Sequence, residues 1–597
     1  MEPAGASDSR GDRRLLVGAT LAAMAVAVVL RAPALEVGYF QDDAMQIAVL
    51  ENAYPAERSP FDLFRFADMA RDGRAPLDVG ALPWWSDPDL RIAMFRPLSS
   101  ALIAVDHRVA GANARAAHLH SMLWFVACIA AFALAVGARF PAALAAVAVF
   151  AFAMDEAHSI PVAWLANRSC LVAQCFGWLG VWAHLRAQRR AGAGPRALEA
   201  IFFSLALAGG EYALAMLAYP IALELAASAR SLRARVGALL PSVVPGLVYL
   251  ALRGALGFGA SGSGLYLDPL AAPRAFSQAA VERLLTLATK LVLGGTARFG
   301  LDAATPQAWI AAGIVAIVIL LGAAWWAGRA LPHAQRRALI AFALGALIAL
   351  APTVGAMADE RLLGAAAGGA ATVVGGVVFA AASRARRALH AQRILRAIPL
   401  VAVAALAIWV HVFEAAASAR ATLARFAAQA HAEWNWAQRA AIPDDPNARV
   451  FFLSGADFTT NANLLWVRHL GGHGAPRSLW RLSPYTVRHQ IKRVADDAIE
   501  VQVGQGMSLP LANTLYRADR KPLRPGDQIE VDGMRVTVLD AQGGDPSRLR
   551  FEFAHSLDDP SYVFLHATPG GLERVALPPV GGRIRLAQPA VPPNERR

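Results

Sequence analysis

The feature that most constrains the fold of this chain is a series of long apolar runs separated by short polar stretches. Of the 597 residues, 56% are hydrophobic and 17% are charged, and the mean hydropathy is +0.39. Soluble domains average about 25% charged residues, and a membrane-spanning helix needs about 20 apolar residues in succession. The runs therefore predict a polytopic membrane protein. The eleven expected spans are 14–33, 113–136, 140–154, 161–185, 197–209, 212–229, 236–255, 306–328, 337–356, 362–383 and 395–417.

Arginines follow every second span, and this alternation predicts the orientation of the chain. By the positive-inside rule the arginine-bearing loops are cytoplasmic, so the N-terminus is expected inside the cell. The net charge of +13 comes largely from these clusters, and no nucleic-acid partner is predicted. The Ala-, Gly- and Arg-rich composition suggests a bacterial inner membrane. The clusters include Arg13, Arg14, Arg139, Arg189, Arg190, Arg230, Arg235, Arg336, Arg337, Arg386 and Arg387.

The expected fold is an all-α polytopic membrane domain over 1–417, followed by a small β-rich soluble domain. Segments 34–95 and 256–305 face outward as loops, the second with an amphipathic helix near Phe276–Leu293. Residues 418–440 predict a helical connector. The C-terminal residues 441–597 contain runs that read as β-strands: 449–453, 498–503, 528–531, 535–539, 548–553, 562–566 and 583–586. Asp532-Gly533 predicts a hairpin turn between two of them. This domain is expected on the periplasmic side, and no catalytic motif is recognised in it, so a binding or packing role is favoured.

Two adjacent carboxylates, Asp42 and Asp43, follow the first span. In a water-filled cavity the pair could supply a general base, because neighbouring carboxylates raise one another's pKa. Alternatively they form the acidic first turn of a solvated helix over Ala44–Asn52. The residues alone favour the second interpretation.

Three arginines are expected at the outer edge of the membrane domain: Arg96, Arg168 and Arg361. A guanidinium group suits a phosphate through paired hydrogen bonds, so together they suggest a lipid-phosphate site. The alternatives are snorkelling to headgroups or ion pairing, for example with Glu360.

Histidines and cysteines do not predict a metal site. His118 and His120 are two residues apart on a helix, so they point to different faces. His158 suits a structural or substrate contact, and Glu211 is a loop or cavity acid. The three cysteines lie in apolar runs, so we expect them to be small side chains of the core. No metal ligand and no cofactor are predicted, and a divalent metal is possible without support.

Four segments, in this order, resemble the motifs of the GT-C superfamily of membrane glycosyltransferases. The nearest resemblance is to bacterial relatives of the transmembrane, tetratricopeptide-bearing O-mannosyltransferases. The segments are Phe40-Gln41-Asp42-Asp43; Phe95-Arg96-Pro97-Leu98 with Asp106, His118 and His120; Val162-Ala163-Trp164-Leu165-Ala166-Asn167-Arg168; and Ala358-Asp359-Glu360-Arg361-Leu362. Glu211 with Pro220 matches a fifth motif more weakly, with Gly210 in place of its lysine.

The resemblance implies an inverting transfer of a sugar from a polyprenyl-phosphate carrier to an exoplasmic protein, lipid or glycan. Asp42 or Asp43 would act as base, and Arg96, Arg168 and Arg361 would bind the donor phosphate. The remaining candidates implied for the site are His118, His158, Glu211 and Glu360. Loop 256–305 would cover it.

The chain departs from the family pattern at three places. Ile160 stands where the family has an acid, the tyrosines expected after Arg361 are absent, and no tetratricopeptide repeats follow. Two alternatives therefore stay open. One is a non-catalytic transporter or flippase of a lipid-linked or anionic substrate. The other is a degenerate GT-C scaffold.

Overall fold

The computed structural model divides the chain into two compact units, each assembled from separated stretches. It describes residues 9–189, 192–227, 230–294, 305–454, 463–483, 488–503, 514–518, 521–542, 545–568 and 571–587. The helical unit comprises Met1–Val37, Phe95–Gly257 and Ala272–Ala427. The β-rich unit comprises Gly38–Met94, Phe258–Ala271 and Ala428–Arg597.

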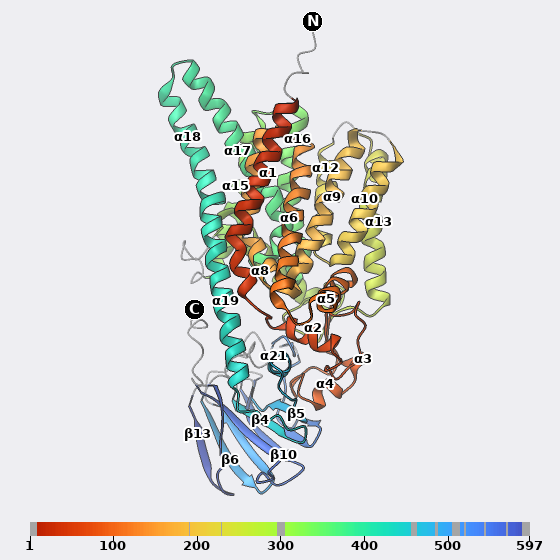
Figure 1. The fold of residues 1–597 in the computed structure, drawn as a ribbon, viewed down its shortest axis with the longest axis vertical. Coiled ribbons are helices and arrows are strands. Elements are labelled where there is room, and N and C mark those ends of the chain that lie inside the picture. The colour runs from red at the N-terminus through yellow and green to blue at the C-terminus, as the bar shows by residue number, and fades with distance from the viewer. Residues whose placement is uncertain are drawn as a thin grey trace. The chain divides into compact units, whose positions relative to one another are not determined.

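The helical unit is a bundle of long apolar helices, which run from α1 in red to α18 in turquoise in Figure 1. Short 3₁₀ turns join several of them. The helices are α1 (Ser9–Arg31), α5 (Pro97–Ala110), α6 (Ala114–Gly137), α7 (Ala142–Met154), α8 (Ser159–Ala163), α9 (Ser169–Arg189), α10 (Ala193–Gly209), α11 (Ala213–Met216), α12 (Ala218–Ala226), α13 (Leu232–Ala255), α14 (Pro273–Leu293), α15 (Pro306–Gly328), α16 (His333–Ala349), α17 (Gly364–His390), α18 (Ile394–Ile408) and α19 (Ala415–Arg439).

Long apolar helices make the chain a multi-pass integral membrane protein, but the expected count of about eleven spans is not confirmed. Among the described residues seven helices are long and apolar enough to cross a membrane, or eight if α7 and the segment Glu156–Ala163 form one span bent by 50°. The shortfall has local causes. Helix α10 has 17 residues, and the expected span 212–229 is divided between the short helices α11 and α12. Among the described residues, each of the eleven apolar runs overlaps at least one helix.

Small residues explain why α17 occupies the centre of the bundle. It is rich in Gly and Ala, and most of it is buried among neighbouring helices. A Cβ atom added at Gly368 would lie 2.1 Å from the ring of Trp178, and one at Gly375 would lie 2.6 Å from the carbonyl oxygen of Leu144. Close backbone approach of this kind is the usual means of packing helices in a membrane, where no hydrophobic force distinguishes protein from lipid.

The helix expected near Phe276–Leu293 is confirmed as α14. Its Arg283 donates hydrogen bonds to the carbonyl oxygens of Val354 and Ala356, at 2.9 and 3.0 Å. These carbonyls belong to the end of the 3₁₀ turn Ala351–Gly355 and the residue after it. Helix α14 is therefore fixed against the segment that leads to Arg361.

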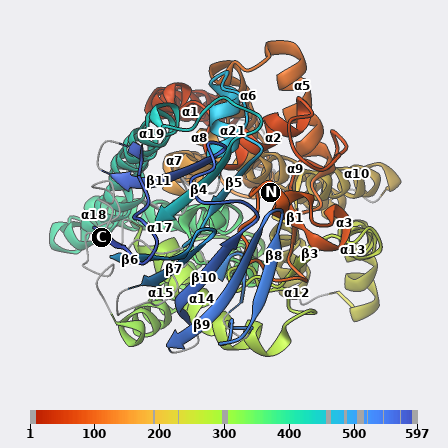
Figure 2. The same cartoon turned by 90° about the horizontal axis from the view of Figure 1, so that it is seen from below.

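The β-rich unit contains three sheets. The largest is antiparallel with the order β13-β6-β7-β10-β9-β8, and its strands fan out in Figure 2. A four-stranded sheet has the order β12-β11-β4-β5, and a small one joins β1, β2 and β3. The strands are β1 (Arg65–Asp68), β2 (Arg91–Ala93), β3 (Gly259–Ser261), β4 (Arg449–Ser454), β5 (Ser478–Arg481), β6 (His489–Ala495), β7 (Ala498–Val503), β8 (Gln528–Val531), β9 (Met534–Gln542), β10 (Asp545–Phe553), β11 (Tyr562–Thr568), β12 (Gly571–Arg574) and β13 (Arg583–Leu586).

The predicted β-rich character of the C-terminal region is confirmed, and so is the Asp532-Gly533 hairpin. Strands β8 and β9 pair antiparallel from Val531 opposite Met534, and Gly533 has φ +75° as this turn requires. The polar strand β6 and the short strands β5 and β12 are additional to the expected ones.

Most of the first expected loop packs with the C-terminal region rather than with the helices. The indole of Trp84 donates to the carbonyl oxygen of Leu482 at 3.2 Å, and Trp480 donates to that of Leu77 at 3.0 Å. Both tryptophans are almost fully buried. By packing, Gly38–Met94 and Phe258–Ala271 thus belong to the β-rich unit. The functional division at 417, 418–440 and 441–597 stays a prediction.

Candidate functional site

Arg96 and Glu211 form a buried ion pair that joins two separated motif segments. Arg96 precedes α5, which begins with Pro97, and Glu211 follows the Gly209-Gly210 end of α10. The guanidinium binds both carboxylate oxygens, with Nε at 2.9 Å from Oε2 and Nη2 in contact with Oε1. Nη1 donates to Ser169 Oγ at 3.1 Å. Burial raises the pKa of Glu211, but Arg96 lowers it further, so the net pKa is below its ordinary value.

Arg168 is the centre of a second buried cluster. It ends the 3₁₀ turn Leu165–Arg168 and is 2% exposed. Its Nε donates to Ser121 Oγ at 2.8 Å and its Nη2 to the carbonyl oxygen of Ala117 at 2.9 Å, both on α6. Its Nη1 pairs with Asp106 on α5. Most donors of this guanidinium are thus occupied by protein groups.

His120 extends the Arg168 cluster in a fixed tautomer. The indole N–H of Trp124 donates to His120 Nε2 at 3.0 Å, so this nitrogen carries no proton. The proton then lies on Nδ1, which is 2.6 Å from Asp106 Oδ1 and donates to it. The Asp106 carboxylate is held by both Arg168 and His120, so we assign it a structural role: it orients the start of α6 against α5.

Arg361 is the most accessible of the three predicted arginines. It lies in the 3₁₀ turn Glu360–Leu362, and its guanidinium carbon stands 5.0 Å from the ring centre of Trp164. Its Nε is 3.6 Å from Asp359 Oδ1, a long ion pair, and 21% of its side chain is exposed. Its charge also acts on Tyr212, which stacks under Arg96. Arg361 therefore lies near the Arg96–Glu211 pair.

Glu360 pairs with Lys290 on α14. The sequence did not single out Lys290, although it is the lone lysine of the helix predicted to cover the site. Together with Arg283 it ties α14 to the arginine-bearing turn. This contact supports the expectation that segment 256–305 covers the site.

The two candidate histidines are fully buried. His118 lies within α6, and His158 packs against the rings of Phe125 and Phe152. Next to His158, Arg31 at the end of α1 donates to the carbonyl oxygens of Ala153 and Asp155, at 3.0 and 2.6 Å. Arg31 caps the end of α7. The sequence indicates it through its place directly after the apolar run that ends at Leu30.

Asp42 and Asp43 belong to the β-rich unit, in the first turn of α2 (Asp42–Leu50). Asp43 is 2% exposed, and its Oδ2 accepts the backbone N–H of Phe40 at 3.0 Å, so it closes the turn. Asp42 is partly exposed, and its charge acts on Tyr516. The preceding Gln41 has φ +46° and ψ −111°, a strained conformation for a residue with a side chain.

Within the described residues, no group of three or more His, Cys, Asp or Glu side chains is arranged to hold a metal ion. The expectation that no cofactor is needed stays a prediction.

Comparison with known proteins gives structural matches only. No protein-family model matches the chain, and no curated protein matches it. An oligosaccharyltransferase of Archaeoglobus fulgidus tethered to an acceptor peptide matches with 13% identity and a TM-score of 0.44, over 78% of this chain and 64% of that one. The same archaeal enzyme with an inhibitory peptide and dolichol-phosphate gives 13% identity, the same coverage and a TM-score of 0.42.

A second match is ArnT from Cupriavidus metallidurans bound to undecaprenyl phosphate, with 14% identity and a TM-score of 0.36. It covers 78% of this chain and 85% of ArnT. This chain spans just under two thirds of the oligosaccharyltransferase. At such identities and TM-scores the likeness assigns neither a substrate nor an activity to this chain, and the nearer O-mannosyltransferase branch stays a prediction.

Proposed function

We propose that the protein is a membrane glycosyltransferase that takes a sugar from a polyprenyl-phosphate carrier and transfers it, with inversion, to an acceptor outside the cell membrane. The observation that carries the proposal is the meeting of motif segments inside the helical unit. Arg96 contacts Glu211 and Ser169, Arg168 contacts Asp106, and Arg361 stacks on Trp164. Segments that lie 62 residues or more apart in the sequence are thus brought together by the side chains that the motifs share.

In the proposed reaction an acceptor hydroxyl attacks the anomeric carbon of the donor. The bond from the hydroxyl oxygen to that carbon forms as the bond from the carbon to the phosphate oxygen breaks. The hydroxyl proton passes to a carboxylate, and the polyprenyl phosphate leaves as an anion stabilised by guanidinium groups. In the proposed orientation the N-terminus is cytoplasmic and the C-terminal domain periplasmic, in a bacterial inner membrane.

The local geometry supports different roles for the two carboxylates. Asp43 is committed to the backbone N–H of Phe40, whereas Asp42 is partly exposed. Gln41 has a strained backbone conformation. Such conformations cost of order 1–3 kcal/mol each, persist only where the surrounding structure fixes them, and cluster at functional sites. We therefore assign the role of general base to Asp42, whereas Asp43 maintains the shape of the turn.

The three arginines also differ in how protein groups hold them and in how exposed they are. Arg96 and Arg168 are held by carboxylates and hydroxyls, so they position the segments that carry them. Arg361 keeps 21% of its side chain exposed, and its ion pair with Asp359 is long, at 3.6 Å. Arg361 is therefore assigned to the donor phosphate, with Lys290 nearby on the covering helix.

Binding of the carrier tests the assignment of Arg361. The purified protein is titrated with undecaprenyl phosphate and, in parallel, with undecaprenol, which lacks the phosphate. Wild-type protein is expected to bind the phosphate form more tightly, and Arg361→Gln to lose that preference. Arg274→Gln removes the same charge from an exposed position on α14 and should keep it. Asp359→Asn, which removes the carboxylate near Arg361, should tighten binding.

Transfer itself is tested by mass spectrometry of envelope glycans from cells with and without the gene. A glycan lost on deletion should return with wild-type protein and with Glu57→Gln, an exposed acid of the β-rich unit, but not with Asp42→Asn. If Asp42→Asn and Arg361→Gln both restore it fully at normal expression, the enzymatic assignment of these residues is wrong.

A further inference from the structure

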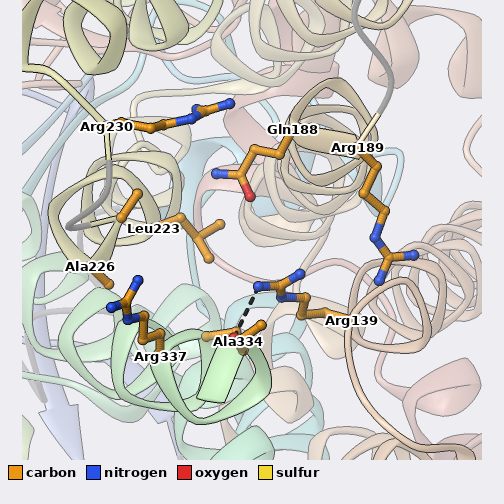
Figure 3. A pocket seen from close by; sticks show the side chains of 10 residues that line it. Arg139, Gln188, Arg189, Leu223, Ala226, Arg230, Ala334 and Arg337 are labelled. Atoms are coloured by element: carbon orange, nitrogen blue, oxygen red, sulfur yellow. Dashed lines mark hydrogen bonds between the residues drawn. The ribbon is translucent and has the colours of Figure 1, made fainter. Parts of the chain in front are cut away.

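A cavity of about 240 Å³ lies in the helical unit among the ends of helices that carry the positive-inside arginines. Its walls come from the turn between α6 and α7, the end of α9, the end of α12 and the start of α16. Four arginines line it, with Gln188 and apolar residues between them (Figure 3): Arg139, Arg189, Arg230 and Arg337. None of the candidate site residues lines this cavity, so the proposed glycosyl transfer does not use it.

One of the four charges is neutralised within the protein. Arg230 Nη1 is 2.9 and 3.1 Å from the two oxygens of Glu224, which is almost fully buried. Gln188 donates to the same carboxylate at 2.9 Å. This wall of the cavity is therefore held in place by a buried acid and is electrically balanced.

The other three charges are not balanced. In the part of the chain that the structure describes, no carboxylate lies within 4.0 Å of Arg139, Arg189 or Arg337. Arg139 donates from Nη2 to the carbonyl oxygen of Ala334 at 2.9 Å, and its Nε is buried without a hydrogen-bond partner among the described residues. Burial and the charge of Arg189 lower the pKa of Arg139. Like charges gathered in this way favour an anion.

The positive-inside rule explains why arginines lie at this end of the bundle, but it does not require them to meet. Loop arginines can point into water independently, whereas these come from separate loops and line one cavity. Figure 3 shows the side chains of Arg139 and Arg337 on one side of the opening, with Gln188 and Arg230 across from them. The positive-inside rule therefore explains the charges at this end of the bundle but not the meeting of four arginine side chains in one cavity.

We propose that this cavity binds a phosphate group, carried either by an anionic lipid or by a free phosphate. Guanidinium groups bind phosphate through paired, charge-assisted hydrogen bonds. Pockets for drug-sized ligands measure about 300–1,000 Å³, so a cavity of this size suits a headgroup rather than a sugar nucleotide. Basic pockets between membrane helices on the cytoplasmic side are a known setting for anionic headgroups.

The test uses the full-length protein and has two arms. In the first, sodium phosphate is titrated against sodium chloride at equal ionic strength, and the melting temperature is followed in detergent. In the second, the protein is placed in nanodiscs of phosphatidylcholine alone or with an equal part of phosphatidylglycerol. A ligand that binds only the folded state raises the melting temperature, and the rise grows with the logarithm of the ligand concentration above the dissociation constant. A response in the first arm identifies free phosphate as a ligand, and a response in the second alone identifies the lipid.

Matched variants separate the cavity from general surface charge. Arg139→Gln and Arg337→Gln are each expected to weaken the apparent affinity about tenfold, since each removes charge-assisted hydrogen bonds. Arg233→Gln removes the same charge from an exposed position on α13 outside the cavity and should respond as wild type does. If Arg139→Gln fails to fold, Arg337→Gln carries the test, because no hydrogen bond of its side chain is recorded among the described residues. Absence of a response in both arms, or equal loss in Arg233→Gln, overturns the proposal.

Discussion

Removing one partner of the Arg96–Glu211 pair tests the network that joins the motif segments. In Glu211→Ala the guanidinium of Arg96, 7% exposed, loses its carboxylate and keeps its contacts with Ser169 Oγ and the Tyr212 ring. Breaking a buried pair in this way costs about 3–5 kcal/mol. Because 32% of the Glu211 side chain is exposed, water screens the pair, and we expect the lower end, about 3 kcal/mol.

A double-mutant cycle isolates the pair from the other effects of truncation. Arg96→Ala, Glu211→Ala and the double variant are unfolded reversibly in detergent micelles, with tryptophan fluorescence as the signal. We expect a coupling free energy of about 2 kcal/mol, within the range for residues in direct contact. The control is the Arg115–Glu36 pair, 3.5 Å apart with side chains 70% and 64% exposed, for which roughly 0–1 kcal/mol is expected.

The pH dependence of the same pair has a definite sign. The pKa of Glu211 is lowered in the folded state, so its contribution to stability is complete above the unfolded pKa and is lost as the pH falls through the folded pKa. The difference between wild type and Glu211→Gln should be constant near neutral pH and shrink below about pH 4, near the pKa of an unperturbed glutamate. Additive single effects in the cycle, or a difference that grows in acid, would refute the ion pair.

Two further changes test the packing of each unit. Gly368→Ala places a Cβ atom 2.1 Å from the Trp178 ring and should destabilise the helical unit by about 1–3 kcal/mol in thermal unfolding, whereas Gly322→Ala, with no atom within 4 Å, should not. Trp480→Phe removes the donor to the carbonyl oxygen of Leu77 and should cost about 1–3 kcal/mol. It should also speed proteolysis within Gly38–Met94, and unchanged cleavage would argue against the packing of this segment in the β-rich unit.

Apolar runs and alternating patterns predicted much of the fold because each reflects burial along one continuous element. The runs located the helices, and period-two alternation located β7 and β8 to the residue. The pattern failed where burial depends on distant segments. Loop 34–95 is polar and rich in Pro, Gly and Trp, which resembles an exposed loop, yet Trp84 and Trp85 join the core of the β-rich unit.

The sequence selected the candidate residues but not their pairings. The motif order selected Arg96, Arg168, Arg361 and Glu211, yet only the fold shows that Arg96 and Glu211 bind each other. Lys290 was missed because a single lysine in an amphipathic helix resembles an ordinary solvated side chain. Its partner Glu360 lies 70 residues away, a separation that no local pattern reports.

The buried pairs of the helical unit are better understood as positioning devices than as sources of stability. Withdrawing two charges from water costs nearly as much as their attraction returns, so apolar replacements of equal volume would hold the bundle together as well. Apolar side chains would not, however, fix the angle and register of separate segments. Arg96 binds the loop after α10 to the start of α9, and Arg168 binds α5 to α6. Arg168 ends the turn that Trp164 precedes, and the Trp164 ring lies 5.0 Å from the guanidinium carbon of Arg361, so the Arg168 network also positions the ring on which Arg361 stacks.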